Sequence, residues 1–212
     1  VNFAVLGTEE SSTRDAAKRA GNEFLFQMQA MMNIEILNGY QVKKIVTCDP
    51  HSFNTLKNEY PSLGGKYEVF HHTQFIRNLI SEGRLNIDKT TLKGKRVTFH
   101  DPCYLGRAND VYESPRDLIR RLGVNLTEMK RNKASALCCG AGGAQMFKDA
   151  EKGNKEINIL RTEDALETKP NIIATGCPYC NTMMTDGIKF KEKETEVTVK
   201  DIAELISEAN HL

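Results

Sequence analysis

Five of the six cysteines of this chain lie in three short segments, and a fold that brings these segments together would create a site with five thiols. These cysteines are Cys103, the pair Cys138-Cys139, and a C-x-x-C motif at Cys177 and Cys180, with 34 and then 37 residues between the segments. Thiolates are soft ligands that prefer zinc, copper(I) or iron–sulfur iron, so such a set without a secretory context predicts a metal site before a disulfide framework. Zinc needs four thiolates, and the fifth favours an iron–sulfur cluster.

Short β-branched runs alternate with segments of helical periodicity along the chain. We expect strands at Phe3–Leu6, Lys44–Thr47, Tyr67–Phe70, Arg96–His100, Leu126–Lys130 and Asn171–Thr175. We expect helices at Asp15–Leu37, Thr73–Gly83, Arg116–Leu122 (capped by Ser114 and Pro115), Ile157–Leu166 and Val199–Ala209. Met28, Met31 and Met32 recur at helical spacing, which predicts a stripe facing the core. The alternation predicts an α/β fold with two tandem Rossmann-like units, each a parallel sheet with helices on both faces.

The cysteine segments occupy the places where such sheets build their sites. Cys103 and Cys177 each come shortly after an expected strand, and the carboxyl ends of parallel strands meet at one edge of a sheet. Cys138-Cys139 opens a glycine-rich loop, whose backbone can approach closely and whose N–H groups can face sulfur. We therefore expect the three segments to converge.

The two halves of the chain resemble each other, with a boundary in the polar stretch 86–95. Ser11-Ser12 precedes Asp49-Pro50-His51-Ser52 by nearly the distance that separates the cysteine pair from the C-x-x-C motif. This predicts one unit at 1–90, degenerate and incomplete, and a second at 91–212 that carries the cysteine site. Serine hydroxyls do not ionise near neutral pH and are poor ligands for iron, so we expect the first unit to bind no metal.

Bulk properties exclude several classes of protein. A formal net charge of +1 gives no electrostatic reason for a nucleic acid partner. The apolar runs are too short to span a bilayer, and the first residues lack the basic segment of a signal peptide. Because the chain opens on Val1 in an apolar run, we expect it to be part of a longer protein.

The full cysteine pattern, C-x34-CCG-x36-CxxC, resembles the CCG domain, the cysteine-rich module of heterodisulfide reductase and related iron–sulfur oxidoreductases. The segments 100–107 and 177–187 look like the second repeat of that family, and 6–13 and 49–57 look like the later part of its first repeat. The likeness is closest to proteins similar to the D and B subunits of heterodisulfide reductase. Family members usually carry cysteines where Ser12, Asp49 and Ser52 stand here.

The resemblance implies a function and a cofactor. In the family, the CCG cysteines bind a [4Fe-4S] cluster, which in heterodisulfide reductases is a noncubane arrangement that can use a fifth thiolate. The ligands implied here are Cys103, Cys138, Cys139, Cys177 and Cys180. The implied role is that of an electron-transfer subunit of an oxidoreductase. Its expected partners are an electron-transfer flavoprotein, a dehydrogenase subunit or quinone. We expect a cytoplasmic protein, with any membrane association supplied by segments upstream of Val1 or by partners.

Two other functions are compatible with the same cysteines. One is a scaffold in which zinc holds the units together without a redox role. The other is an enzyme that uses Cys177 and Cys180 directly as a dithiol. His100 can either hydrogen-bond a sulfide or relay a proton, or be a satisfied histidine at a strand end, which the local pattern favours. We expect no ligand role for His71 and His72, and a structural role for Cys48.

Overall fold

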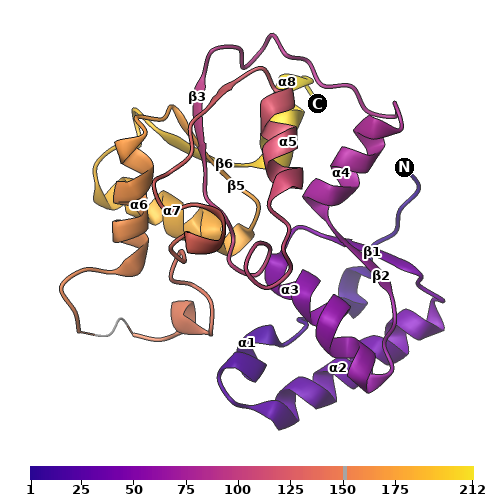
Figure 1. Cartoon of the computed structure of the whole chain (residues 1–212). Helices are drawn as coiled ribbons and strands as arrows, with labels where there is room; N and C mark the ends of the chain where they lie inside the picture. The colour runs from indigo at the N-terminus through magenta and orange to yellow at the C-terminus, as the bar shows by residue number, and fades with distance from the viewer. Residues whose placement is uncertain (150–151) are drawn as a thin grey trace.

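The structure, a computed structural model, describes residues 1–149 and 152–212 (Figure 1). The α-helices are α1 (Asp15–Arg19), α2 (Glu23–Gly39), α3 (Pro50–Asn54), α4 (His72–Ser81), α5 (Glu113–Arg121), α6 (Ile157–Glu167), α7 (Pro178–Phe190) and α8 (Ile202–Ala209). The strands are β1 (Lys44–Thr47), β2 (Glu68–His71), β3 (Arg96–Phe99), β4 (Asn125–Leu126), β5 (Ile172–Thr175) and β6 (Thr198–Asp201). Single turns of 3-10 or π-helix lie at 7–9, 55–63, 133–135 and 145–147.

The strands form two parallel sheets, which confirms the predicted α/β class. β1 pairs with β2, and the other four follow the order β4-β3-β5-β6. All pairs in both sheets are parallel, so each strand returns to the sheet through a crossover. Parallel sheets bury both faces under helices, and the second sheet follows this rule.

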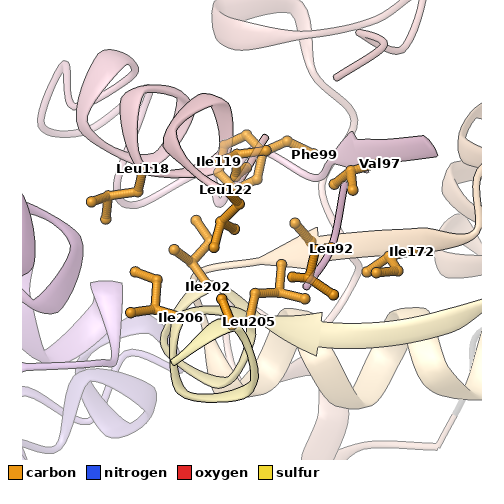
Figure 2. Close-up of a cluster of buried hydrophobic side chains, with 12 residues drawn as sticks. Leu92, Val97, Phe99, Leu118, Ile119, Leu122, Ile172, Ile202, Leu205 and Ile206 are labelled. Atoms are coloured by element: carbon orange, nitrogen blue, oxygen red, sulfur yellow. The ribbon is translucent and has the colours of Figure 1, made fainter. Parts of the chain in front are cut away.

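Helices cover the second sheet on both sides. On one side α5 and α8 pack on apolar side chains from β3 and β5, and Figure 2 shows this cluster closing around Phe99, Ile119 and Leu205. On the other side α6 and α7 pack around Ile173 and Met184. The two helices approach closely because Gly187 has no side chain: a Cβ there would lie 2.0 Å from Thr162 Oγ1. The sheet is thereby fixed from both faces, with its strand ends left free to carry a site.

The first sheet is smaller and shares its cover with the second. α2 packs on one face of β1 and β2 through a stripe spaced at three and four residues, namely Phe26, Ala30, Ile34 and Leu37. α4 stands beside α5 (Figure 1), and its Ile76 and Ile80 pack against the core of the second sheet. α4 therefore contacts the strands of the first sheet and packs against the core of the second.

The N-terminal segment differs from the prediction. Phe3–Leu6 is not a strand, and Phe3 is 82% exposed. No described strand lies beside this segment, so its backbone has no ladder to join, and β propensity without a partner does not make a strand. Leu6 alone packs against the first core.

The predicted helix at 15–37 is divided, and its exposed face was misassigned. Gly21 (φ 86°) and Asn22, whose side chain accepts from Leu25 N–H, end α1 and begin α2. The prediction that Met28, Met31 and Met32 face the core is wrong, since all three are exposed. α2 buries the opposite stripe, because two apolar stripes share this helix and only one meets the sheet.

Three further boundaries differ in the second unit. The predicted helix at Val199–Ala209 begins as strand β6 and becomes α8 only at Ile202, where Asp201 and Glu204 form a capping box. The strand expected at Leu126–Lys130 is only β4 (Asn125–Leu126). The helix expected from Arg116 already begins at Glu113, so Ser114 and Pro115 lie inside its first turn. Helices α3 and α7 were not predicted, and both follow shortly after strands.

Candidate metal centre

The five cysteines of the motif lie at the ends of strands and on one loop. Cys103 follows β3, Cys177 lies between β5 and α7 at the N-cap position, and Cys180 lies in the first turn of α7. Cys138 and Cys139 lie on the irregular loop between β4 and α6. Three separate segments of the chain therefore supply the cysteines.

The sulfurs of these segments come together as the strand ends predict. Cys103 Sγ lies 3.9 Å from Cys138 Sγ, and Cys180 Sγ donates to Cys139 Sγ at 3.4 Å. Cys139, Cys177 and Cys180 are at most 4% exposed and pack as one cluster, with Cys138 beside them. None of the cysteines is in a disulfide. Their convergence follows from the edge of the second sheet; their role as ligands remains a prediction.

Glycine at the third position of the C-C-G sequence is required by the geometry. Gly140 has φ 95°, and a Cβ there would lie 2.3 Å from Ile157 Cγ2 at the start of α6. Its N–H donates to Cys138 Sγ at 3.4 Å. The tight turn therefore presses the loop against α6 and points a backbone donor at sulfur, a contact that stabilises negative charge on the thiolate.

The thiols share negative charge unevenly. Hydrogen bonds from Cys103 and Cys139, with that from Gly140 N–H, hold the pKa of Cys138 far below its usual range. The same contact raises the pKa of Cys103, and donation to Cys138 together with burial raises that of Cys139 to about 12. The pKa of Cys180 is raised by its contacts with Cys139 and Cys177 and by burial. One thiolate surrounded by thiols is a set of donors that a cation would deprotonate on binding.

A buried ion-pair network holds the loop that carries the cysteine pair. Arg116 of α5 is fully buried and binds Asp101 through two hydrogen bonds, while Glu128 accepts from the same guanidinium. Asp101, two residues before Cys103, also accepts from Lys133 N–H at 2.8 Å. Two cysteine segments are thereby anchored to a single carboxylate.

His100 lies close to two of the cysteines. It is fully buried at the end of β3, and its Nδ1 accepts from Arg161 Nε at 3.0 Å. A ring nitrogen of His100 and the sulfurs of Cys139 and Cys180 all lie within 4.8 Å of one another. Burial first, then the positive charge of Arg161, lowers the pKa of His100 to about 3, so the imidazole stays neutral. Sequence reasoning did not find Arg161, because nothing marks a buried arginine within a helical segment.

The first-half residues that align with cysteines of the second half make hydrogen bonds within the first half of the chain. Ser11 Oγ donates to Asn33 Oδ1, and Ser12 Oγ accepts from Arg14 N–H. The Asp49 carboxylate caps α3, accepting from His51 N–H, Ser52 N–H and Ser52 Oγ. Ser12 and Asp49 thereby satisfy nearby backbone N–H groups, whereas Ser11 bonds to a side chain of α2. That the first unit binds no metal remains a prediction.

His51 from the first half of the chain nevertheless contacts two aromatic residues that adjoin cysteines of the site in sequence. His51 stacks on Tyr104 with ring centroids 4.2 Å apart and meets Tyr179 edge-on at 5.4 Å. Its Nδ1 lies 2.7 Å from Asp15 Oδ2. Burial alone would raise the pKa of the Asp15 carboxyl, but hydrogen bonds with His51 and Arg19 outweigh it and hold the pKa below its usual value. The sequence offered no signal for this contact between units.

His71, His72 and the sixth cysteine, Cys48, lie where the two halves of the chain meet. His71 Nε2 lies 3.0 Å from the carbonyl oxygen of Gly176, directly before Cys177, and Nδ1 lies 2.7 Å from Thr73 Oγ1. His72 pairs with Asp201 at 3.0 Å. Cys48 is exposed at the end of β1, and partial desolvation of its sulfur, then the charge of Asp201, raise its pKa.

The donor set fits a soft cation or an iron–sulfur cluster. It offers five thiols in a largely buried cluster, with a backbone N–H directed at one sulfur. Thiolate-only donors suit zinc and iron–sulfur iron, and they do not suit magnesium or calcium, which prefer oxygen. Among the described residues, no helix is both long and apolar enough to cross a bilayer.

Comparison with known proteins agrees with this chemistry. Residues 97–185 match the cysteine-rich domain family CCG. The chain is 47% identical over 210 residues to a probable iron-sulfur-binding oxidoreductase, FadF, of Bacillus subtilis, and 42% identical over 215 residues to an EtfAB:quinone oxidoreductase of Syntrophomonas wolfei. It is 34% identical over 220 residues to the D subunit of the dihydromethanophenazine:CoB--CoM heterodisulfide reductase of Methanosarcina barkeri.

Each alignment covers 99% of this chain but a smaller part of the relative. The chain spans 29% of the Bacillus protein, 30% of the Syntrophomonas protein and 52% of the Methanosarcina protein. The shared portion includes the whole of the matched domain. Residues 97–185 therefore form a cysteine-rich domain of the CCG family, within a chain whose homologues are iron–sulfur oxidoreductases and the D subunits of heterodisulfide reductases.

Proposed function

We propose that the chain is the cluster-binding part of an electron-transferring oxidoreductase and holds one [4Fe-4S] cluster. The proposed ligands are Cys103, Cys138, Cys139, Cys177 and Cys180. The observation that carries this is the convergence of three cysteine segments, with sulfur pairs 3.4 and 3.9 Å apart in a site that contains no disulfide. Cysteine thiolates are the usual ligands of such clusters.

The number of thiols supports iron over zinc. A structural zinc site is closed by four ligands, and a fifth buried thiol would then lack a cation. A cluster with several irons can engage all five, in the noncubane arrangement that the family resemblance implies. Gly140 N–H would face cluster sulfur or a ligating thiolate, where hydrogen bonds tune the reduction potential.

The proposed partners are redox proteins and a small electron carrier. The names of two relatives describe an EtfAB:quinone oxidoreductase and a probable iron-sulfur-binding oxidoreductase. By analogy, we propose that this chain exchanges electrons with an electron-transfer flavoprotein, a dehydrogenase subunit or quinone. The chain spans under a third of those relatives, so these partners concern the longer protein to which it corresponds.

Anaerobic metal analysis tests the cofactor. Protein reconstituted with iron and sulfide should hold about four irons and four acid-labile sulfides per chain, as the cluster formula requires. It should be brown and should lose visible absorption on reduction. Stoichiometric zinc without sulfide would contradict the proposal and would support a zinc-stabilised scaffold.

One observation favours a second candidate, a direct dithiol enzyme. The sulfurs of Cys139 and Cys180 lie only 3.4 Å apart across two segments, closer than the 3.9 Å between Cys103 and Cys138. A disulfide between them would require little movement. Peptide mapping of alkylated protein during turnover with a disulfide substrate decides between the two: a Cys139–Cys180 bridge in iron-free, active protein would favour the dithiol enzyme.

A further inference from the structure

One ring nitrogen of His100 lies within 4.8 Å of the sulfurs of Cys139 and Cys180, and the two ring nitrogens have different surroundings. Nδ1 accepts a hydrogen bond from Arg161 Nε at 3.0 Å. Nε2 is buried and has no hydrogen-bond partner within the described part of the chain. A buried polar atom without a partner costs free energy, so its persistence requires an explanation.

The arginine determines the tautomer. A guanidinium has only donors, so the nitrogen that it contacts must carry the lone pair. The proton of the neutral imidazole is therefore on Nε2. Arg161 cannot easily turn away, because it is fully buried and also donates to the carbonyl oxygen of Arg131 and to Asp164.

The same arrangement argues against His100 as a metal ligand. Its distance from Cys139 and Cys180 would suit a mixed histidine and cysteine site. A ligating nitrogen, however, must offer a lone pair, and the lone pair of this ring is directed at Arg161. The nitrogen that remains offers a proton instead.

We propose that His100 is a positioning residue that donates its Nε2–H to a sulfur of the cluster, and that Arg161 fixes it in the donating tautomer. This inference rests on the proposed [4Fe-4S] function. A hydrogen bond to cluster sulfur stabilises the more negative, reduced state and so raises the reduction potential. Unlike Gly140 N–H, this donor is a side chain, and it directly follows the inner strand β3.

The test compares two substitutions in the cluster-loaded protein. His100→Leu removes the donor, and His100→Gln keeps an N–H. With iron and sulfide contents equal to those of the wild type, H100L should shift the midpoint potential to more negative values and H100Q should shift it less. His211→Leu, a change at an exposed histidine, controls for loss of a histidine as such and should leave the potential unchanged.

Spectroscopy of the reduced wild-type protein provides a second measurement that does not depend on the folding of H100L. Electron–nuclear double resonance should reveal a proton coupled to the cluster that is lost in D2O and is altered in strength in H100Q. Equal potentials in wild type and H100L would overturn the inference. So would an unchanged proton coupling in H100Q, or the strong coupling to ¹⁵N-histidine that direct ligation produces.

The outcome for the proposed function is separate. Iron and sulfide content alone decide whether the chain holds a cluster, and they are measured before any potential. If the wild-type protein holds a cluster but its potential is the same in H100L, the proposed cluster stands and only the proposed role of His100 is wrong.

Discussion

The turn after β1 and the turn after β5 have the same design but use different chemistry. In each, a strand ends, two residues follow, and a proline occupies the first position of the next helix. In the first unit Asp49 precedes Pro50 and caps α3 with its carboxylate. In the second unit Cys177 precedes Pro178 and makes no side-chain cap, so its sulfur is left available. The comparison teaches that a ligand slot is lost when the side chain turns to its own backbone.

A second correspondence supports the same relationship. β2 passes directly into α4 and β6 passes directly into α8, and each junction has a capping box, His71 with Gln74 and Asp201 with Glu204. The residues between proline and the last slot, His51 and Tyr179, meet edge-on across the junction of the units. Division into units at 1–90 and 91–212 remains our proposal, which these repeated junctions support.

The largest expected effect is the loss of the cluster on removal of one thiol. Cys180→Ser should lower iron retention by more than the roughly 10- to 100-fold that loss of an outer-shell partner costs in metal affinity. The corresponding change in the first unit, Ser52→Ala, should leave iron content unchanged. Anaerobic iron and sulfide analysis measures both. Loss of iron in S52A would show that the first unit binds metal after all.

The next effect concerns buried charge. Arg116→Met in the second unit leaves Asp101 buried without its partner and should lower the free energy of unfolding by about 3–5 kcal/mol. Arg19→Met in the first unit removes a partly exposed pair with Asp15 and should cost about 1 kcal/mol or less. Urea denaturation at neutral pH measures the two. Equal losses would mean that the two networks are equally desolvated.

Acid should weaken the junction between the units through His71. Burial, then the neighbouring His72, lowers the pKa of His71 from 6.5 to about 3. Below pH 6.5 His71 is protonated in the unfolded chain, whereas in the folded chain it stays neutral until the pH is near 3. The contribution of His71 to the free energy of unfolding should therefore be complete above pH 6.5 and fall by about 1.4 kcal/mol for each pH unit within this window.

His71→Gln supplies the control, since glutamine can hydrogen-bond but does not titrate. The stability measured by thermal unfolding between about pH 7 and pH 4 should fall less steeply in H71Q than in the wild type. Parallel slopes would show that other groups determine the acid sensitivity.

A smaller loss of stability is expected when the helix cap in the turn after β1 is removed. Asp49→Ala removes the cap of α3 and should lower the free energy of unfolding by about 1 kcal/mol. Asp49→Asn keeps an acceptor and should cost less. Chemical denaturation of the two variants measures the difference, and an equal loss in both would assign the cost to charge rather than to capping.

The smallest effect concerns an exposed methionine, set against a buried one. Met31 of α2 is 61% exposed, and Met31→Gln should change the free energy of unfolding by no more than about 0.5 kcal/mol. Met184 of α7 is fully buried, and Met184→Ala, the reference variant, should cost about 2–5 kcal/mol. The same denaturation series compares them. A large loss in M31Q would mean that α2 buries this face in solution.

The sequence predicted the features that depend on local pattern and on topology. Strands β1, β2, β3 and β5 were placed within one or two residues, because each is a short β-branched run bounded by polar residues. The placement of Cys103 and Cys177 after the parallel neighbours β3 and β5 followed from the rule that such strands end at one edge of the sheet. The order of the cysteines was enough to indicate the family.

Features that depend on which surfaces meet could not be predicted. α2 has two apolar stripes, and only the sheet decides that Ile34 is buried and Met31 is not. The contacts of His51 with Tyr104, and of His71 with Gly176, join residues from different units that no periodicity relates. The lone pair on His100 depends on Arg161, sixty-one residues away.

Hydrogen bonds hold the loop that carries Cys138 and Cys139, and they suggest an order of assembly for the site. Asp101 accepts from Lys133 N–H, and Arg107 donates to the carbonyl oxygen of Ala136, just before the cysteine pair. These protein contacts offset part of the entropy lost when this long segment is ordered. The chain can therefore fold first and receive its cofactor last. Iron and sulfide would then be delivered to a folded site and not to a nascent chain.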